Sequence, residues 1–341
     1  MEAVVINAAA LLVTLAAFGV FVALFGVDPL AVYHALYLGA FATRISIETT
    51  LTQAAPLILT ALCTAIPARA GLLVIGGEGA LVVGGVATVL VGVNLGETPA
   101  PVAVVLMGLA GMAAGGVWIG AAGALRQYRG VNETISTLLM NYIAIALMNH
   151  LVTGPIRDFA QILKPASWSV PKEFMVGTIP GLDVHWGLIV GVVVCVGLYV
   201  LMRRTTFGFG VDVLGGNQRA AQMAGLPINR MVLIACFIGG AGAGLAGAME
   251  VIAVHGFASD SLVVGYGYAG ILIAFLARQN PFAIILVAIL VGGISASGGL
   301  LQRWFDLPDA ATGVLQGMLF LVVLASNTLY GRFRIFQAQE A

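Results

Sequence analysis

The chain has 341 residues, of which 60% are hydrophobic and only 9% are charged, and its formal net charge is zero. Soluble domains are about 45–50% apolar and about 25% charged, so most of this chain cannot face water. The composition excludes a soluble globular protein, gives no sign of nucleic-acid binding, and indicates a polytopic membrane protein.

Long uncharged runs predict that the membrane spans are helices. Residues Val4 to Gly26 contain no ionisable side chain, and about 20 apolar residues in a helix cross the hydrocarbon core. The alternating segments of a β-barrel are not seen. We therefore expect an all-α bundle of about 8–10 transmembrane helices, drawn from the apolar segments 4–26, 49–68, 71–93, 100–125, 134–153, 186–202, 231–252, 265–277, 281–300 and 311–330. The segment 265–277 is short, and we expect it to be re-entrant or broken at Gly265 and Gly267.

Glu78 lies within the apolar segment 71–93, where a carboxylate is expensive and usually faces a cavity or a partner. Two interpretations stay open. Glu78 lies beside a translocation path and accepts hydrogen bonds from a ligand, or it accepts them from backbone N–H groups of a helix broken at the neighbouring glycines. Gly76, Ala80 and Gly84 recur every four residues, which predicts a face for close helix packing.

The segment 134–153 carries a polar stripe, because Thr134, Thr137 and Asn141 share one helix face at i, i+3 and i+7. At membrane depth such a stripe either lines a hydrated path or bonds to a neighbouring helix. We favour the path, since Asn141 is near the middle of the span. Asn132 precedes the segment as a predicted N-cap.

Two polar loops, 154–185 and 203–230, set the predicted orientation. If 203–230 is cytoplasmic, ten of the fifteen Lys and Arg residues lie inside, Arg332 and Arg334 among them, and five lie outside. Cytoplasmic loops carry an excess of Lys and Arg, so both termini are predicted to be cytoplasmic and 154–185 periplasmic. The periplasmic loop is the expected landing surface for a delivery protein, or else a solvated lid.

A short helix is predicted within the cytoplasmic loop from its caps, in the stretch VLGGNQRAAQMAGLPINR at 213–230. Asn217 is a favourable N-cap, Gly225 fits the C′ position, and Pro227 stops continuation. A helix this short is marginal in water and needs a surface to pack against. It is either a surface helix in the headgroup region or a docking element for a cytoplasmic partner. Its residues are Asn217, Arg219, Ala220, Ala221, Met223, Ala224 and Gly225.

Small residues recur again in the segment 231–252. Gly239, Ala243 and Gly247 share one face at four-residue spacing, which allows close approach of another helix backbone. We expect these three residues to serve helix packing rather than ligand binding.

No motif indicates that the chain performs chemistry. Its only lysines are Lys164 and Lys172, and neither belongs to a G-x-x-x-x-G-K-[ST] phosphate loop; HExxH and CxxC motifs are absent as well. We expect a transport subunit that is not an enzyme and binds no metal or cofactor. Transport driven by nucleotide would then need another subunit to hydrolyse ATP.

The segment 214–251 resembles the membrane-domain signature of bacterial ABC importers of the branched-chain amino acid, ribose and nucleoside permease family. The family pattern G-x-N-x-x-A-A-x-x-A-G is matched by Gly215 or Gly216, Asn217, Ala220, Ala221, Ala224 and Gly225. The segments LLVIGGEGALVVGG at 72–85 and GVNETISTLLMNYIA at 130–144 resemble the same family. With DPLAVYHALYLGAF at 28–41, the likeness is greatest to nucleoside and purine-type permeases. Val74 and Ala80 depart from the Asn and Gln of those permeases, which bears on the ligand.

The resemblance implies a single type II ABC importer-like membrane domain over residues 1–341, in the bacterial inner membrane. It implies that the helix at about 217–225 docks into a cytoplasmic ATPase subunit that binds ATP and Mg²⁺. A second permease, identical or homologous, would pair with this chain, and a substrate-binding lipoprotein would deliver the ligand. Nucleosides are the expected solutes, carried by alternating access; a ribose-like sugar or a branched-chain amino acid is the alternative within the family.

The residues support three functions outside this family less well than they support a transport subunit of the family. An ion-coupled secondary transporter predicts several intramembrane carboxylates or an inverted repeat of broken helices, and only Glu78 fits. An intramembrane enzyme needs paired catalytic groups at one depth, and none are evident. A purely structural subunit is the remaining alternative.

Overall fold

The computed structural model describes residues 2–161, 164–308 and 310–326, and this part of the chain forms helices and no β-strand. Within it, seven helical segments are long and apolar enough to cross a membrane, or eight if a bent pair at the N-terminus counts as one span. The predicted all-α membrane bundle is confirmed, and the seven or eight candidate spans compare with the 8–10 that the sequence predicted. The seven are α3 (Arg44–Arg69), α4 (Gly77–Asn94), α5 (Ala100–Arg129), α6 (Glu133–Thr153), α7 (Gly187–Arg204), α10 (Ile228–Met249) with the π-helical turn η3 (Glu250–His255), and α12 (Pro281–Ala296) with α13 (Gly298–Phe305).

The chain divides into two compact units, Met1–Gln53 with Ile289–Ala341, and Ala54–Ala288. The prediction of one domain over residues 1–341 stays a prediction. Of the cytoplasmic arginines assumed for the orientation, Arg332 and Arg334 lie outside the described residues.

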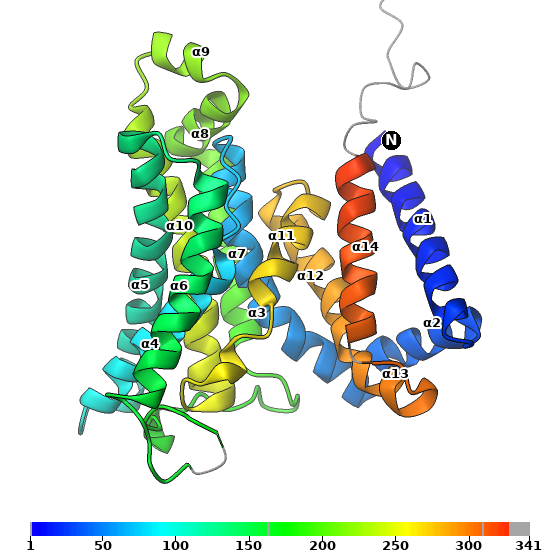
Figure 1. Ribbon diagram of the computed structural model, residues 1–341. Coiled ribbons are helices and arrows are strands. Elements are labelled where there is room, and N and C mark those ends of the chain that lie inside the picture. The colour runs from blue at the N-terminus through cyan, green and yellow to red at the C-terminus, as the bar shows by residue number, and fades with distance from the viewer. Residues whose placement is uncertain (1, 162–163, 309, 327–341) are drawn as a thin grey trace, which may run out of the picture. The chain divides into compact units, whose positions relative to one another are not determined.

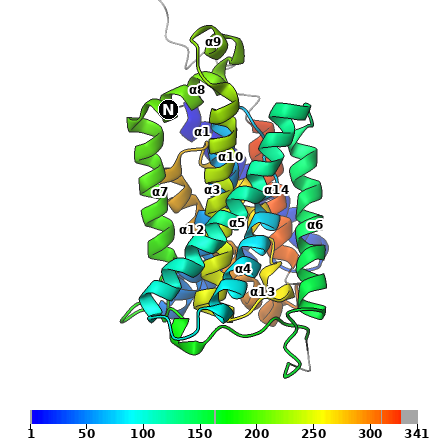
Figure 2. The same ribbon diagram turned by 90° about the vertical axis from the view of Figure 1, so that its left-hand side faces the viewer.

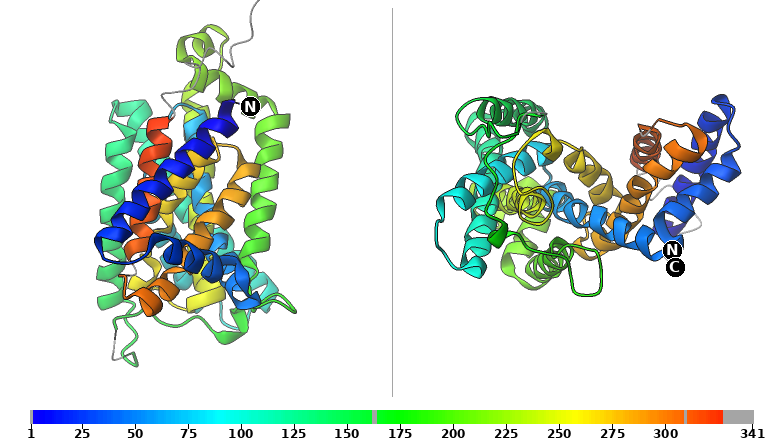
Figure 3. Two further views of the ribbon diagram at one scale, coloured as in Figure 1. Left: turned by 90° about the vertical axis from the view of Figure 1, so that its right-hand side faces the viewer. Right: turned by 90° about the horizontal axis from the view of Figure 1, so that it is seen from below.

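The first unit contains the bent pair. The helix α1 (Glu2–Leu24) is followed by α2 (Pro29–Tyr37) and the π-helical turn η1 (Leu38–Ala42), and the chain direction bends by 118° between Ala9–Leu24 and Pro29–Ala42. The bend has a local cause, because Gly26 has a left-handed φ of 76° and Asp28 caps α2 by accepting from the Leu30 N–H at 3.0 Å. The helix α14 (Ala310–Ser326) lies alongside α1 (Figures 1 and 3). Phe18, Leu301 and Leu315 belong to the apolar core of this unit.

The second unit is built around α4, α5 and α10, which pack so closely that only glycine fits at several contacts (Figure 2). A Cβ at Gly84 would collide with the backbone of Gly244, and one at Gly247 would collide with the carbonyl oxygen of Leu81. Such backbone-to-backbone contact is typical of small-residue faces in membranes. Ala80 is fully buried in the same unit.

The remaining small residues singled out in the sequence also lie at tight places. A Cβ at Gly76 would come within 2.6 Å of a methyl carbon of Ile119, and one at Gly239 within 3.0 Å of the Cys63 carbonyl oxygen. Ala243 is fully buried.

Two expected segments need correction. The apolar segment 71–93 is not one helix, because residues 72–76 are non-helical and α4 begins only at Gly77. The loop 203–230 contains two helices, α8 (Thr206–Gly216) and α9 (Gln218–Met223), and the first of them was not predicted. The Thr205 hydroxyl caps α8 by accepting from the Gly208 N–H at 3.3 Å. The sequence signal was therefore an ordinary Thr N-cap three residues before a glycine.

Candidate functional site

The short helix α9 is held by the caps that the sequence predicted. The side-chain oxygen of Asn217 accepts from the backbone N–H groups of Arg219 (2.9 Å) and Ala220 (3.2 Å). At the other end Gly225 has a φ of 71°, and the Leu226 N–H donates to the Ala221 carbonyl at 3.1 Å. This is a Schellman-type ending, in which the left-handed residue is almost always glycine. The two caps define a six-residue helix whose ends are both satisfied.

The two faces of α9 differ in exposure. Ala221 is fully buried in an apolar cluster that also contains Leu214 of α8 and Met231 of α10. Met223 is 88% exposed, and Ala220, Ala224 and Gly225 are exposed beside it. The buried face attaches α9 to its own chain. The exposed side of the helix carries one long apolar side chain, Met223, together with small residues and the polar side chains of Arg219 and Gln222.

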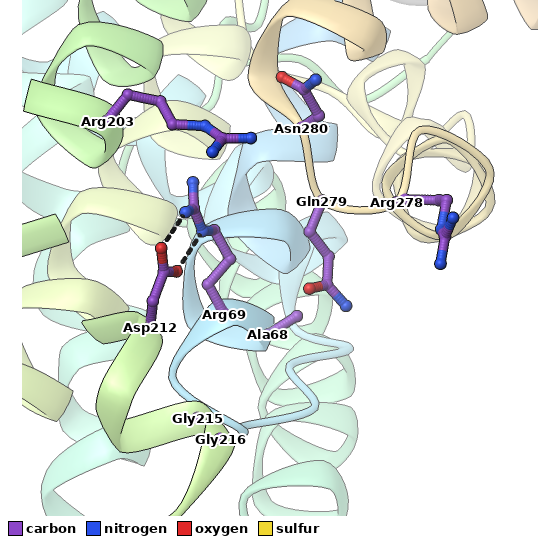
Figure 4. Close-up of a pocket in the computed structure, with 9 residues that line it drawn as sticks. All are labelled: Ala68, Arg69, Arg203, Asp212, Gly215, Gly216, Arg278, Gln279 and Asn280. Carbon is purple, nitrogen blue, oxygen red and sulfur yellow. Dashed lines mark hydrogen bonds and ion pairs between the residues drawn. The ribbon is translucent and has the colours of Figure 1, made fainter. Parts of the chain in front are cut away.

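The helix α8 fastens this element to the end of α3. The Nε and Nη2 atoms of Arg69 donate hydrogen bonds to the two carboxylate oxygens of Asp212, at 2.8 and 2.6 Å (Figure 4). A Cβ at Gly215 would collide with the Arg69 carbonyl oxygen, so the two backbones touch. Bidentate Arg–carboxylate pairs are geometrically specific. Movement of α8 and α9 is therefore tied to the end of α3.

The break between α3 and α4 is stabilised by the polar stripe of α6. Residues 72–76 are non-helical, so most of their backbone groups need partners from elsewhere, and unpaired backbone groups are costly in a membrane. The Thr134 hydroxyl donates to the Leu73 carbonyl (3.0 Å), and the Ile75 N–H donates to the Thr137 hydroxyl (3.1 Å). The stripe thus supplies the partners that the broken backbone needs.

Asn141 completes this support from the ninth residue of the 21-residue helix α6. Its amide nitrogen donates to the Ile75 carbonyl at 3.0 Å, and its amide oxygen accepts from the Gly79 N–H at 2.8 Å. The side chain is fully buried and also lies 3.5 Å from the Tyr268 hydroxyl oxygen. Contact with a neighbouring segment was the alternative that the sequence left open for this stripe. The preferred role, lining of a path, stays a prediction.

Glu78 joins the broken start of α4 to the start of α11 (Tyr266–Leu276). Its two carboxylate oxygens accept from the backbone N–H groups of Gly265 (2.8 Å) and Gly267 (2.6 Å), and the residue is fully buried. A Cβ at Gly267 would collide with the Glu78 backbone. Carboxylates are favourable at helix N-termini, where N–H groups lack partners. The sequence offered backbone N–H groups beside Glu78 as one alternative; the actual donors lie 187 and 189 positions away.

The other buried carboxylates in the described part of the chain each have a basic neighbour. Glu48 bonds Arg44 at 2.8 Å and Glu133 lies 3.3 Å from Arg126. Glu250 lies 3.5 Å from His255, which forms an ion pair with it only when the imidazole is protonated. Among the described residues, no group of three or more His, Cys, Asp or Glu side chains could hold a metal ion. The interior of the second unit therefore offers a ligand polar but uncharged groups, in addition to carboxylates already in use.

At the opposite end of the second unit, the long loop 154–185 is fastened to the turn after α10. The Val170 N–H donates to the Gly256 carbonyl (2.8 Å), and the Ala258 N–H donates to the Ser167 hydroxyl (2.8 Å). A cavity of about 690 Å³ lies beneath it. Its lining is Ala160, Gln161, Lys164, Ala166, His255, Phe257, Ser259 and Ser261. The loop is thus pinned at its middle and open on one side.

Sequence comparison places these features in a known group of proteins. Residues 46–324 match the family model described as branched-chain amino acid transport system / permease component. The match includes α9, the break at residues 72–76 and the α6 stripe.

Individual relatives are similar along most of their length. The chain is 32% identical to the glucose ABC transporter permease protein TsgB13 of Haloferax volcanii, over 95% of this chain and 87% of that protein. It is 30% identical to the guanosine ABC transporter permease protein NupP of Bacillus subtilis, over 87% and 86% of the two chains. It is 26% identical to the nucleoside ABC transporter permease protein NupB of Lactococcus lactis, over 88% and 85%.

Proposed function

This chain belongs to the permease components of the branched-chain amino acid transport family, and we propose that it is the membrane subunit of an ATP-driven importer whose foremost solutes are nucleosides. In the proposed assembly it pairs with a second permease, identical or homologous. Cytoplasmic ATPase subunits bind ATP and Mg²⁺, and a substrate-binding lipoprotein delivers the solute. The assembly lies in the cell inner membrane of a bacterium with both termini of this chain in the cytoplasm.

The observation that carries the coupling role is the exposed face of α9. Met223 is 88% exposed on a helix whose own ends and buried face need no further partner. A large, exposed apolar side chain with the small residues Ala220 and Ala224 nearby is suited to filling a groove on another protein. We therefore assign Met223, with Ala220 and Ala224, to the contact with the ATPase subunit, and Ala221 to attachment within this chain.

In the proposed cycle, ATP-driven displacement of α9 reaches the membrane helices through α8. The Arg69–Asp212 pair and the Gly215 backbone contact connect α8 to the end of α3. That end continues into residues 72–76, which are hydrogen-bonded to α6 and lead directly to Glu78 and α11. The helices on the two sides of this break then reorient around the path.

The pairing of the carboxylates favours a neutral solute. A buried charge without a partner is suited to selecting an ionic ligand, but Glu48 and Glu133 lie beside arginines and Glu78 is bonded by backbone N–H groups. Glu250 lies beside His255, which is charged only when protonated. Nucleosides are neutral and rich in hydroxyl groups. The similarity to a guanosine permease and a nucleoside permease supports this solute class.

A neutral sugar is the second candidate. It is favoured by the 32% identity to a glucose permease, which extends over 95% of this chain. A branched-chain amino acid, the third possibility within the family, would bring a carboxylate and an ammonium group that the paired charges of the interior do not match.

Uptake by cells that produce the full transporter separates the solute classes. Labelled guanosine, glucose and leucine would be supplied to cells with and without this chain, at matched levels of the other subunits. Loss of guanosine uptake alone supports the proposal. Loss of glucose uptake with unchanged guanosine uptake overturns the solute and keeps the importer.

The docking role is tested on α9 with a matched pair of variants. Met223→Asp places a charge on the exposed apolar face and should lower uptake by about ten-fold or more, as for a central interface residue. Met223→Leu keeps an apolar side chain of similar size and should retain uptake. Equal uptake by both variants, with equal amounts of protein in the membrane, would overturn the assignment of α9 as the ATPase contact.

A further inference from the structure

A basic cavity lies beside α8, on the side of the second unit that carries α9. It has a volume of about 290 Å³. Its lining comes from the ends of α3 and α7, from α8 and from the turn between α11 and α12, and its polar side chains are those of Arg69, Arg203, Asp212, Arg278, Gln279 and Asn280. The coupling role proposed above uses three of its lining residues, Arg69, Asp212 and Gly215, as the link between α3 and α8, and assigns no ligand to the cavity itself.

Two guanidinium groups face the same space in the cavity. Figure 4 shows the Arg203 guanidinium lying over that of Arg69, whereas the Arg278 side chain points away. Asp212 bonds Arg69, and among the described residues no carboxylate forms an ion pair with Arg203. Arg203, Arg69 and Asp212 together therefore leave one net positive charge facing this space. A ligand with one negative charge and several oxygen acceptors would balance them.

The cavity lies at the level where apolar spans end. Arg69 is the last residue of α3, Arg203 belongs to the last turn of α7, and Pro281 begins α12. Helix ends of this kind meet the headgroup region of a bilayer. Basic pockets between membrane helices at this level are suited to the phosphate of an anionic lipid headgroup.

An exposed apolar surface continues from the cavity toward the middle of the spans. Tyr199 is one helical turn before Arg203 on α7, and its ring lies 6.2 Å from the ring of Phe282 on α12. Phe282 is 57% exposed and Leu286, one turn further along α12, is 63% exposed. Aromatic side chains are enriched at the membrane interface. The surface can therefore contact the acyl chains of a lipid whose headgroup occupies the cavity.

Two consecutive non-glycine residues at the rim of the cavity have left-handed backbone conformations. The φ angles are 50° for Arg278 and 59° for Gln279. Such conformations are unfavourable for residues with a Cβ and tend to be retained at functional sites. They shape the turn whose next residue, Asn280, lines the same cavity.

We infer that this cavity binds the phosphate of an anionic phospholipid, held between Arg203 and Arg69, with the acyl chains along Tyr199 and Phe282. Arg203 is the better residue to replace in a test, because its side chain is exposed and makes no ion pair within the described residues. Arg69, in contrast, is bonded to Asp212 and connects α3 to α8. An acidic side chain of a partner subunit would match the charge, but it would leave the adjoining aromatic surface unexplained.

Arg203 and Arg204 form a matched pair for the test, since both are exposed at the end of α7 and only Arg203 lines the cavity. The full chain would be titrated with phosphatidylglycerol and with phosphatidylcholine in detergent, and bound lipid counted by native mass spectrometry. Arg203→Ala should weaken the binding of the first phosphatidylglycerol molecule by about five- to ten-fold, as for loss of one basic contact near a headgroup. Arg204→Ala should leave it nearly unchanged, and neither variant should change phosphatidylcholine binding.

Three results would overturn the lipid assignment. An equal loss of phosphatidylglycerol binding in Arg203→Ala and Arg204→Ala would indicate a diffuse basic surface rather than a site in the cavity. Stabilisation of the wild-type chain by inorganic phosphate, lost in Arg203→Ala while lipid binding is intact, would assign the cavity to a soluble phosphate. Unchanged lipid binding together with loss of ATPase co-purification in Arg203→Ala alone would assign it to an acidic side chain of the partner.

Discussion

Replacing Glu78 by Gln alters one atom and one charge at the junction between α4 and α11. In the native chain the two carboxylate oxygens accept from the N–H groups of Gly265 and Gly267, at 2.8 and 2.6 Å. A Gln side chain of the same length presents one oxygen acceptor and one NH₂ donor. One of the two backbone N–H groups then faces a donor and loses its partner.

The magnitude follows from these two bonds. Loss of one charge-assisted hydrogen bond costs about 1.5–3 kcal/mol, and leaving a buried amide unsatisfied costs about 1–3 kcal/mol more. Relief of the carboxylate's desolvation offsets part of this loss. We expect a net destabilisation of about 2–4 kcal/mol, which for a large domain lowers Tm by roughly 2–4 °C per kcal/mol.

The assay is thermal unfolding of the purified full chain in detergent, with uptake measured in parallel. Glu97→Gln is the control, because it makes the same chemical change at an exposed carboxylate in the loop between α4 and α5. A Glu78→Gln chain with unchanged Tm and lost uptake would refute the structural account and assign Glu78 to the ligand. Unchanged Tm and unchanged uptake would show that these two hydrogen bonds contribute little.

Three further substitutions separate packing from function. Ala221→Asp buries a charge without a partner and should destabilise the attachment of α9 by on the order of 3–5 kcal/mol, so it should lower Tm as well as uptake. Met223→Asp, by contrast, should lower uptake at unchanged Tm. Identical Tm values for these two variants would contradict the assigned buried and exposed faces of α9. Gly247→Ala forces a methyl group against the Leu81 carbonyl and should cost about 1–3 kcal/mol, seen as a lower Tm; an unchanged Tm would mean that α4 and α10 separate easily. Asn141→Leu leaves the Ile75 carbonyl and the Gly79 N–H without their partner and should lower the free energy of unfolding by about 2–4 kcal/mol. A variant with normal Tm and altered solute preference would instead support the path-lining role.

Features with local causes could be predicted from the sequence. The caps at Asn217 and Gly225 depend on residues within one short segment, so the boundaries of α9 followed from side-chain type alone. The shortness of the segment 265–277 likewise predicted a helix shorter than a full span, and α11 has 11 residues; it begins directly after Gly265 and continues through Gly267, so the break expected at Gly267 is not present. Apolar run length, another local property, placed the long spans. The Thr205 cap of α8 was equally local, but the run that follows contains four glycines and no amphipathic pattern that would identify it as a helix.

Features that depend on distant segments could not be predicted. A stripe of polar residues on α6 and a carboxylate at Glu78 each had two chemically reasonable partners, a ligand or a backbone. Hydrogen-bonding capacity is the same for both, so only the positions of other segments could distinguish them. The structure brings residues 73–79 against α6 and Gly265 against Glu78, across separations of about 60 and 187 positions.

Composition and spacing by themselves determined that this protein is a bundle of membrane helices with a short capped helix in one of its polar loops. A chain with this much apolar surface must face lipid, and in lipid its backbone N–H and C=O groups must bond within the segment, which favours helices. Only the tertiary structure decided which face of α9 is free, which backbone groups the buried polar side chains satisfy, and which arginines meet in one cavity. Those outcomes depend on packing between segments that are remote in sequence, where each side chain's preference is weak until its neighbours are in place.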